Sequence, residues 1–320
     1  MEANGRDRVP LVKIDLPVAQ LSVPMKYRRL GQTELSVSVI GLGTWQFGGE
    51  WGHRYTQAEV DAILDQAEQC GINFIDTAEC YGDHLSESLI GDYLARRDRS
   101  RWIVGTKFGH QFHGFMDRTW HMTAPEVERQ LERSLAALRT DTIDVYQFHS
   151  GSDDQFQQPE LWAMLGQQKK AGKIRHLGIS ISSKAGPLQA NDAPRTGAEV
   201  LQIYYNRLER RAEQDFLPYA QQYDLGVLAR VPLASGFLSG KYTTAGPFPK
   251  DDMRSTLEDA RIRQWLAELD VIRERELPQG VAMAPWALAW CLRNPAVTSV
   301  IPGVKNPDQV KRNASAAELL

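Results

Sequence analysis

The chain has 320 residues, which exceeds an ordinary domain but suits one β/α barrel of about 250 residues with insertions. Its formal net charge of −3 at pH 7 gives no electrostatic reason to expect a nucleic acid or an acidic membrane surface as partner. The three cysteines are odd in number and lack metal-type spacing, which favours a reducing compartment. No apolar run reaches the roughly 18 residues of a membrane span, so we expect a cytoplasmic protein.

The start of the chain lacks the compact apolar stretch of a signal peptide. We expect residues 1–24 to form a flexible N-terminal tail and residues 25–320 to form a single barrel. Residues 27–40 predict a β-hairpin that turns near Gly31 and Gln32, ahead of the first barrel strand.

Short apolar, β-rich runs alternate with helical patterns along the rest of the chain. Several of these runs are apolar throughout, which is typical of strands buried on both faces. The eight predicted strands cover residues 37–43, 72–76, 102–107, 144–149, 175–180, 200–205, 226–231 and 298–303.

The segments between the strands have helical spacing. Thr123 and Glu126 form a capping-box pattern, and apolar residues follow them at the spacing of a helix face. Further helices are predicted over residues 57–70, 85–96, 158–172, 211–223 and 281–293, with a weaker one over 184–198.

Eight alternating β and α units predict an α/β fold of the closed (β/α)8 or TIM barrel type, with the N-terminal hairpin and extended top-face loops added. A Rossmann fold is not predicted, because Gly41 and Gly43 are not followed by a third glycine that opens a helix. The long insertion at residues 236–265 is expected to be a functional loop with helix only towards its end.

Four polar residues stand at or just after the ends of three predicted strands: Asp76, Tyr81, Lys107 and His149. The carboxyl ends of neighbouring strands meet at the top of a barrel, so we expect these side chains within a few ångströms of one another. An ammonium group at Lys107, held by Asp76, favours the Tyr81 phenolate and lowers the pKa of that phenol from about 10. His149 can orient a carbonyl group by a hydrogen bond. The phenol could then protonate an oxygen while an external donor delivers a hydride to the neighbouring carbon.

Asp76 and Lys107 alone would also fit a structural ion pair. Together with Tyr81 and His149, however, the motifs GINFIDTAECYG and VGTK and the strand-end histidine resemble the aldo-keto reductase family, from about Tyr27 to the C-terminus. The resemblance implies that Tyr81 is the general acid/base, that Lys107 and Asp76 tune it, and that His149 orients the carbonyl. It also implies NADPH, or NADP⁺ in the reverse reaction, bound extended across the barrel top, with NADH also possible.

The same resemblance implies a set of cofactor-binding residues. A cation at Lys305 suits the 2′-phosphate of NADPH, and backbone N–H groups and Lys241 suit a pyrophosphate. The implied cofactor residues are Gly43, Thr44, Trp45, Asp76, Ser180, Gln202, Tyr205, Pro232, Leu233, Ser235, Gly236, Leu238, Lys241, Gly303, Lys305, Gln309, Arg312 and Asn313. Among these, Tyr205 matches the aromatic residue on which a nicotinamide ring stacks.

Three positions depart from the family pattern. Ile181 stands where many relatives have Asn or Arg, and Arg230 where some have an aromatic residue beside the cofactor. Arg312 replaces a frequent acid, and it could either add a second contact to a 2′-phosphate or be solvated.

Aromatic and histidine side chains in the top-face loops predict a substrate pocket, with Trp45, Phe47, His110 and Phe112 as candidates. His110 and His113 have a spacing that can bind a metal, but no third ligand is evident nearby, so no metal site is predicted.

The leading hypothesis is the NADPH-dependent reduction of an aldehyde or a ketone to an alcohol, with a small-molecule carbonyl compound as the partner. One alternative is a cofactor-binding regulatory subunit resembling the β subunits of potassium channels. Another is the same site working in the oxidative direction as an alcohol dehydrogenase. The sequence predicts neither the physiological substrate nor the oligomeric state.

Overall fold

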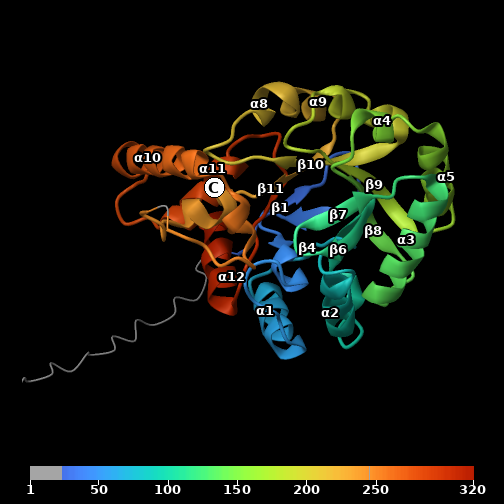
Figure 1. Cartoon of the computed structure of the whole chain (residues 1–320), viewed down its shortest axis with the longest axis horizontal. Coiled ribbons are helices and arrows are strands. Elements are labelled where there is room, and N and C mark those ends of the chain that lie inside the picture. The colour runs from blue at the N-terminus through green and yellow to red at the C-terminus, as the bar shows by residue number, and fades with distance from the viewer. Residues whose placement is uncertain (1–23, 245) are drawn as a thin grey trace, which may run out of the picture.

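The structure is a computed structural model that describes residues 24–244 and 246–320, so most of the predicted N-terminal tail lies outside the described residues. Its centre is a parallel sheet of eight strands surrounded by helices (Figure 1). In spatial order the strands are β12 (Ser299–Ile301), β11 (Gly226–Arg230), β10 (Ala198–Tyr204), β9 (Ile174–Ser180), β8 (Ile143–His149), β5 (Ile103–Phe108), β4 (Phe74–Asp76) and β3 (Leu42–Gly43).

The two end strands of this sheet, β3 and β12, also meet. Parallel bridges join Ile40 to Val300 and Gly43 to Gly303, and the Gly41 N–H donates to the Val300 carbonyl at 2.8 Å. This seam closes the sheet into the predicted (β/α)8 barrel.

The predicted N-terminal hairpin is present, and it covers the bottom of the barrel. Strands β1 (Tyr27–Arg29) and β2 (Ser36–Ser38) pair antiparallel, and Leu30, Leu35 and Val37 pack against the inward-facing apolar side chains of the barrel. These inward-facing residues are Phe74, Val145, Val200, Leu228 and Ile301. The barrel interior is therefore a packed core at this end.

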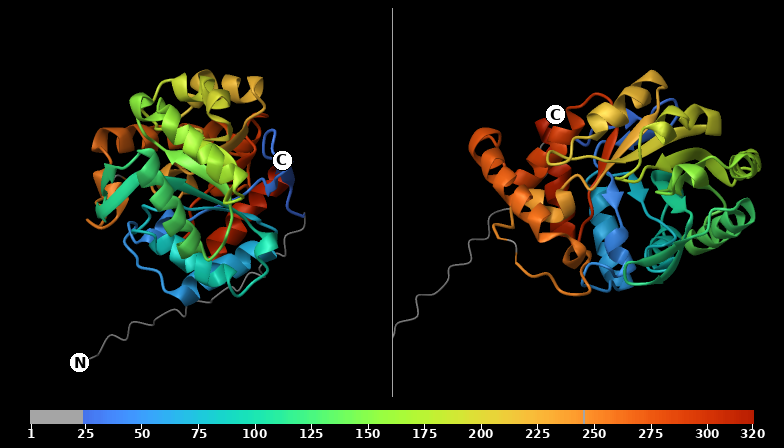
Figure 2. Two further views of the ribbon diagram at one scale, coloured as in Figure 1. Left: turned by 90° about the vertical axis from the view of Figure 1, so that its right-hand side faces the viewer. Right: turned by 45° about the horizontal axis from the view of Figure 1, so that its top comes forward.

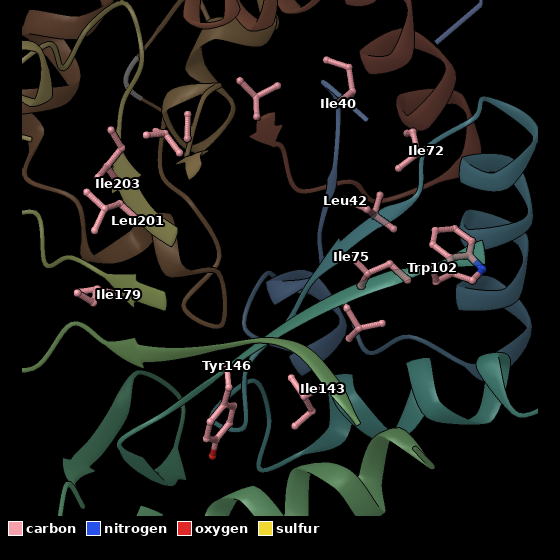
Figure 3. Close-up of a cluster of buried hydrophobic side chains, with 14 of the residues drawn as sticks. Ile40, Leu42, Ile72, Ile75, Trp102, Ile143, Tyr146, Ile179, Leu201 and Ile203 are labelled. Atoms are coloured by element: carbon pink, nitrogen blue, oxygen red, sulfur yellow. The ribbon is translucent and has the colours of Figure 1, made fainter. Parts of the chain in front are cut away.

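The alternate side chains of the strands point outward and pack against the helices. Figure 3 shows part of this outer core, with Ile75 of β4 and Leu201 and Ile203 of β10 among its buried residues. The long helices are α1 (Gln57–Gln69), α2 (Leu85–Leu94), α3 (Ala124–Leu138), α5 (Pro159–Lys170), α10 (Asp259–Arg275), α11 (Met283–Leu292) and α12 (Pro307–Ala314). Shorter ones are α4 (Asp153–Phe156), α6 (Leu188–Asn191), α7 (Ala193–Thr196), α8 (Ala212–Asp215) and α9 (Leu217–Gln222). No helix within the described ranges has both the length and the apolar character needed to span a membrane.

The predicted start of α3 is confirmed. The Thr123 N–H and hydroxyl donate to the Glu126 carboxylate at 3.0 and 2.7 Å, and Glu126 is the third residue of the helix. The buried face of α3 carries Val127, Leu131 and Leu138, which match the predicted spacing.

Two segments of the chain that lie far apart in the sequence meet below the barrel. The Lys26 ammonium donates to the Leu320 carbonyl at 2.6 Å, and the Arg28 guanidinium donates to the Val297 carbonyl at 2.6 Å. In Figure 2 the blue hairpin accordingly lies beside the red C-terminal helix.

The top-face loops differ from the sequence expectations in two places. Residues after β5 form an antiparallel hairpin of β6 (His110–Gly114) and β7 (Asp117–Trp120), which was not predicted. The helix expected near the end of the 236–265 insertion is α10, and it continues to Arg275.

Two glycines inside helices allow a paired test of this packing. A Cβ atom on Gly91 of α2 would lie 2.1 Å from the Ala137 carbonyl oxygen of α3, whereas one on Gly166 of α5 would meet nothing within 4 Å. We expect Gly91→Ala to lower the free energy of unfolding by about 1–3 kcal/mol through overpacking. Gly166→Ala should raise it by up to about 1 kcal/mol, since alanine is the better helix former. Urea unfolding of both variants would measure the contrast, and equal stabilities would show that α2 and α3 are not in such close contact.

Candidate active site

The inward face of several strands changes from apolar to polar towards the top of the barrel. Because side chains alternate along a strand, residues two positions apart share a face. The apolar residue is followed two positions later by a polar one in the pairs Phe74 and Asp76, Val145 and Gln147, Val200 and Gln202, and Leu228 and Arg230. A polar layer, in which Asp76, Gln147 and Gln202 are buried and Arg230 is half-buried, thus lies directly above the apolar filling of the barrel.

Lys107 stands at the centre of this layer and is fully buried. Its ammonium donates to Asp76 Oδ2 at 2.8 Å, to the Thr77 carbonyl at 2.7 Å and to the Tyr81 hydroxyl at 3.2 Å. Burial by itself would lower the pKa of Lys107, but the Asp76 carboxylate and the Tyr81 phenol raise it overall. The structure therefore brings three of the four predicted catalytic residues into one hydrogen-bonded group.

Tyr81 differs from the expectation in the direction of its pKa. Burial raises the pKa of the phenol to about 12, and the opposing effect of the Lys107 ammonium does not outweigh burial. The phenol is consequently protonated at neutral pH and can donate a proton. Its ring stacks on Trp45 with the ring centres 6.0 Å apart, which holds it over the top of the barrel.

The second oxygen of Asp76 is satisfied by two amides. Oδ1 accepts a hydrogen bond from Gln202 Nε2 at 2.6 Å and from Gln147 Nε2 at 3.3 Å. The Ser180 hydroxyl in turn donates to Gln202 Oε1 at 3.3 Å. Each group in this chain orients the next, so the Asp76 carboxylate has a fixed direction towards Lys107.

His149 ends β8 and lies edge-on to Tyr81, with the ring centres 6.3 Å apart. Its Nδ1 lies 3.2 Å from His110 Nδ1 and 3.7 Å from Cys80 Sγ. Burial lowers the pKa of His149 well below its usual range, and nearby His110 and Lys107 act in the same direction. His149 is therefore neutral and could orient a carbonyl group by hydrogen bonding rather than by charge.

A cavity of about 870 Å³ opens above these residues. Tyr81, His149, Trp45 and His110 line it. The other predicted cofactor residues that line it are Gly43, Thr44, Asp76, Gln202, Pro232, Leu233, Ser235, Gly236, Lys241, Gly303, Lys305, Gln309, Arg312 and Asn313. Residues from nearly the whole length of the chain thus converge on one space.

Tyr205 does not line this cavity, contrary to the prediction. Its ring is buried in the outer core against Trp290, and its hydroxyl donates to Glu213 at 2.8 Å. Tyr204 lines the cavity instead, because it shares the inward face of β10 with Gln202. The alternation of side chains along the strand could have found this residue.

Four other predicted cofactor or substrate residues also lie outside the cavity lining, as does the predicted catalytic residue Lys107, which lies beneath it. Leu238 is fully buried in the core beneath α10 and α11, and Phe47 is fully buried in the outer core. Phe112 packs against the Arg118 guanidinium on the β6–β7 hairpin, 5.6 Å from its ring centre. Ser180 contributes only through Gln202, as described above.

The cavity has the features of a dinucleotide site. In the turn after β11, Ser235 and Gly236 line the cavity with φ angles of 55° and 96°, and the Gly236 N–H donates to the Leu233 carbonyl at 2.9 Å. At Gly303 a Cβ atom would lie 2.0 Å from the Gln46 amide nitrogen, so any larger residue at this wall of the cavity would require the Gln46 side chain to move. The residues present therefore fit an extended, anionic cofactor such as NAD(P)H.

Two cations lie at the far end of the cavity. Lys305 Nζ donates to the Trp51 carbonyl at 2.9 Å and lies 4.0 Å from Asp252 Oδ2. Arg312 is exposed on α12 and forms no ion pair with any residue in the described ranges. Its guanidinium is thus available for a phosphate group.

The sequence reasoning missed Glu50 and Arg118, which form a largely buried ion pair at the cavity, and Arg118 belongs to the cavity lining. Glu50 also accepts hydrogen bonds from Trp45 Nε1 at 2.7 Å and from the Met116 N–H at 2.8 Å. Arg118 belongs to the hairpin β6–β7, whose two short alternating runs separated by residues 115–116 are a hairpin signal in the sequence.

Comparison with known proteins identifies close similarities. Residues 39–320 match the family model described as the aldo/keto reductase family. The chain is 30% identical over 322 residues to the NADH-specific methylglyoxal reductase of Escherichia coli, covering 92% of this chain and 94% of the relative. It is also 30% identical over 319 residues to a probable voltage-gated potassium channel subunit beta of Oryza sativa, with 92% of each chain covered.

A solved structure has the same fold. The glycerol dehydrogenase AKR11B4 from Gluconobacter oxydans is 30% identical to this chain, with a TM-score of 0.78 over 91% of this chain and 89% of that one. Three proteins named for different functions are thus similar to this chain at equal identity.

Proposed function

Because the chain belongs to the aldo/keto reductase family, we propose that it uses NADPH to reduce an aldehyde or a ketone to an alcohol, with Tyr81 donating the proton. The observation that carries this proposal is the hydrogen-bonded group of Tyr81, Lys107 and Asp76 at the floor of the cavity. When bound, the nicotinamide supplies the hydride.

The chain's own residues hold and move the proton. Tyr81, protonated at neutral pH, donates its hydroxyl proton to the carbonyl oxygen as negative charge develops there. Lys107 then stabilises the phenolate that remains, because its ammonium lies 3.2 Å from that oxygen. His149 is neutral and orients the substrate oxygen, while the Asp76 carboxylate fixes Lys107 in place.

The test is the consumption of NADPH with a reactive aryl aldehyde such as 4-nitrobenzaldehyde, repeated with NADH. Turnover with the aldehyde supports a reductase. NADPH binding can be monitored by the quenching of tryptophan fluorescence. A protein that binds NADPH but turns over no aldehyde or ketone would contradict the proposal.

The preference for NADPH rests on Arg312 and Lys305. We expect Arg312→Ala to raise the KM for NADPH by roughly 10–100-fold, the equivalent of one charge-assisted hydrogen bond of about 1.5–3 kcal/mol. The KM for NADH should stay unchanged, because that cofactor lacks the 2′-phosphate. Lys311→Ala, which removes a cation from the same helix outside the cavity lining, is the matched control. Equal effects of Arg312→Ala on both cofactors would place the guanidinium elsewhere than at a 2′-phosphate.

Two other candidate functions follow from the relatives. The similarity to a glycerol dehydrogenase favours an oxidative direction, in which the Tyr81 phenolate would accept the proton of an alcohol. The similarity to a potassium channel subunit favours a regulatory role. Alcohol oxidation with NADP⁺ tests the first, and a stable complex in a pull-down together with very slow turnover would support the second.

A further inference from the structure

Four side chains able to bind a metal converge beside Tyr81. Glu79 and Cys80 come from the loop after β4, His110 begins β6 and His149 ends β8. One candidate ligand atom from each lies within 4.8 Å of the others, and no other such group occurs among residues 24–244 and 246–320. The sequence did not predict this group, because the fold rather than the spacing of His110 and His113 supplies the further ligands.

The separations fit a tetrahedral metal site. His110 Nδ1 and His149 Nδ1 are 3.2 Å apart, Cys80 Sγ is 3.7 Å from His149 Nδ1, and Glu79 Oε1 is 3.9 Å from His110 Nδ1. Zinc bonds of about 2.0–2.3 Å at tetrahedral angles would place neighbouring ligand atoms roughly 3.3–3.7 Å apart. All four ligand atoms lie within 4.8 Å of one another, so small side-chain rotations would bring the remaining pairs into this range.

The Glu79 carboxyl group provides a second, independent observation. It is 3% exposed, and while Oε1 accepts the His110 N–H at 2.9 Å, Oε2 has no hydrogen-bond partner within the described part of the chain. A buried carboxyl oxygen without a partner is costly. The carboxyl oxygen that lies 3.9 Å from His110 Nδ1 is Oε1, so a cation between the carboxylate and the two imidazoles would satisfy Oε2 by bidentate binding or after rotation of the carboxyl group.

We propose that Glu79, Cys80, His110 and His149 bind one divalent cation of borderline softness, of which Zn²⁺ is the representative. Neutral imidazole, thiolate and carboxylate are the ligands that Zn²⁺ prefers. Cys80, His110 and His149 line the cavity, so the ion can enter from it.

The ion would act on His149 and not on the substrate. Four protein ligands complete a tetrahedral shell and leave no position for a substrate oxygen. A metal bound at Nδ1 of His149 requires the ring proton to be on Nε2. The ion would therefore fix the tautomer of His149 at the active site. Binding of the ion to these four residues does not depend on the proposed reductase reaction.

The experiment is an isothermal titration calorimetry measurement in which Zn²⁺ alone is added to the whole, chelator-treated protein. We expect one saturable site. Glu79→Gln or His110→Gln should raise its Kd by at least about 10-fold, because replacing even a residue that only supports a metal ligand typically lowers metal affinity by about 10–100-fold. His113→Gln is the matched control, since His113 lies on the same hairpin but is exposed and pairs with Thr119. Loss of binding in His113→Gln, or unchanged binding in His110→Gln, would overturn the proposal.

A spectroscopic measurement keeps the proposal testable if one of these variants does not fold. Co²⁺ in a tetrahedral site with a thiolate ligand gives a sulfur-to-metal charge-transfer band. In the Cys70→Ala/Cys291→Ala variant, Cys80 is the one remaining thiol of the chain. The band should persist in this variant with an intensity equal to wild type, and its absence from both proteins would rule out the site.

Discussion

Tyr81→Phe is expected to lower kcat for aldehyde reduction by about 10²–10⁴-fold, the usual contribution of a positioned general acid. The substitution removes the hydroxyl that accepts a hydrogen bond from Lys107 at the floor of the cavity and leaves no proton to donate at that place. The phenylalanine ring can keep the stacking contact with Trp45, so the shape of the cavity should be preserved. Cofactor affinity should therefore stay close to that of wild type.

Steady-state kinetics and cofactor titration of the purified variant would measure these two effects separately. Tyr223→Phe is the matched control. Tyr223 lies outside the cavity lining, and its hydroxyl makes a long, exposed hydrogen bond of 3.5 Å to the Asn191 side chain. Undiminished turnover in Tyr81→Phe would show that another group donates the proton and would remove the basis of the proposed mechanism.

Lys107→Met should affect both stability and activity. It breaks a fully buried ion pair and leaves the Asp76 carboxylate with only the Gln202 and Gln147 amides as side-chain partners. Breaking such a pair costs about 3–5 kcal/mol, so the free energy of unfolding should fall by that amount. Lys173→Met, which removes an exposed pair with Glu132, should cost no more than about 1 kcal/mol in the same urea experiment.

The pH dependence of Lys107→Met has a defined sign. Alcohol oxidation needs the Tyr81 phenolate, so its rate in the wild type should rise with pH towards the pKa of about 12. The Lys107 ammonium lowers that pKa, and its removal should move the alkaline rise to still higher pH. A pH profile measured on the oxidation of a simple alcohol would test this, and an unshifted profile would mean that Lys107 does not tune Tyr81.

The sequence predicted the barrel because its signals are local. Each buried strand is a short apolar run, and a capping box such as that of Thr123 and Glu126 lies within one turn of its helix. The reactive residues could be found because they directly follow those runs. The contact between Lys107 and Asp76 could be predicted because neighbouring parallel strands end at the same edge of a sheet.

The remaining differences come from tertiary packing. Tyr204 and Tyr205 are identical in chemistry, and only the pleat of β10 decides that Tyr204 faces the cavity. The pKa of Tyr81 is raised because burial of the phenol has a larger effect than the Lys107 ammonium, which lowers that pKa. A sequence motif does not show which of the two effects is larger. The grouping of Glu79 with His110 likewise arises from an unpredicted hairpin.

The seam between β3 and β12 has a consequence for how the protein folds. The two strands are joined across more than 250 residues, and Gly43 and Gly303, which both line the cavity, lie on either side of it. Contacts between such distant segments form late, because much chain entropy must be lost before they can be made. During synthesis the growing chain therefore carries an open sheet with unpaired edges until β12 has left the ribosome. Ligand binding at this cavity should thus report completed folding of the barrel, since no chain that ends before β12 contains both walls of the seam.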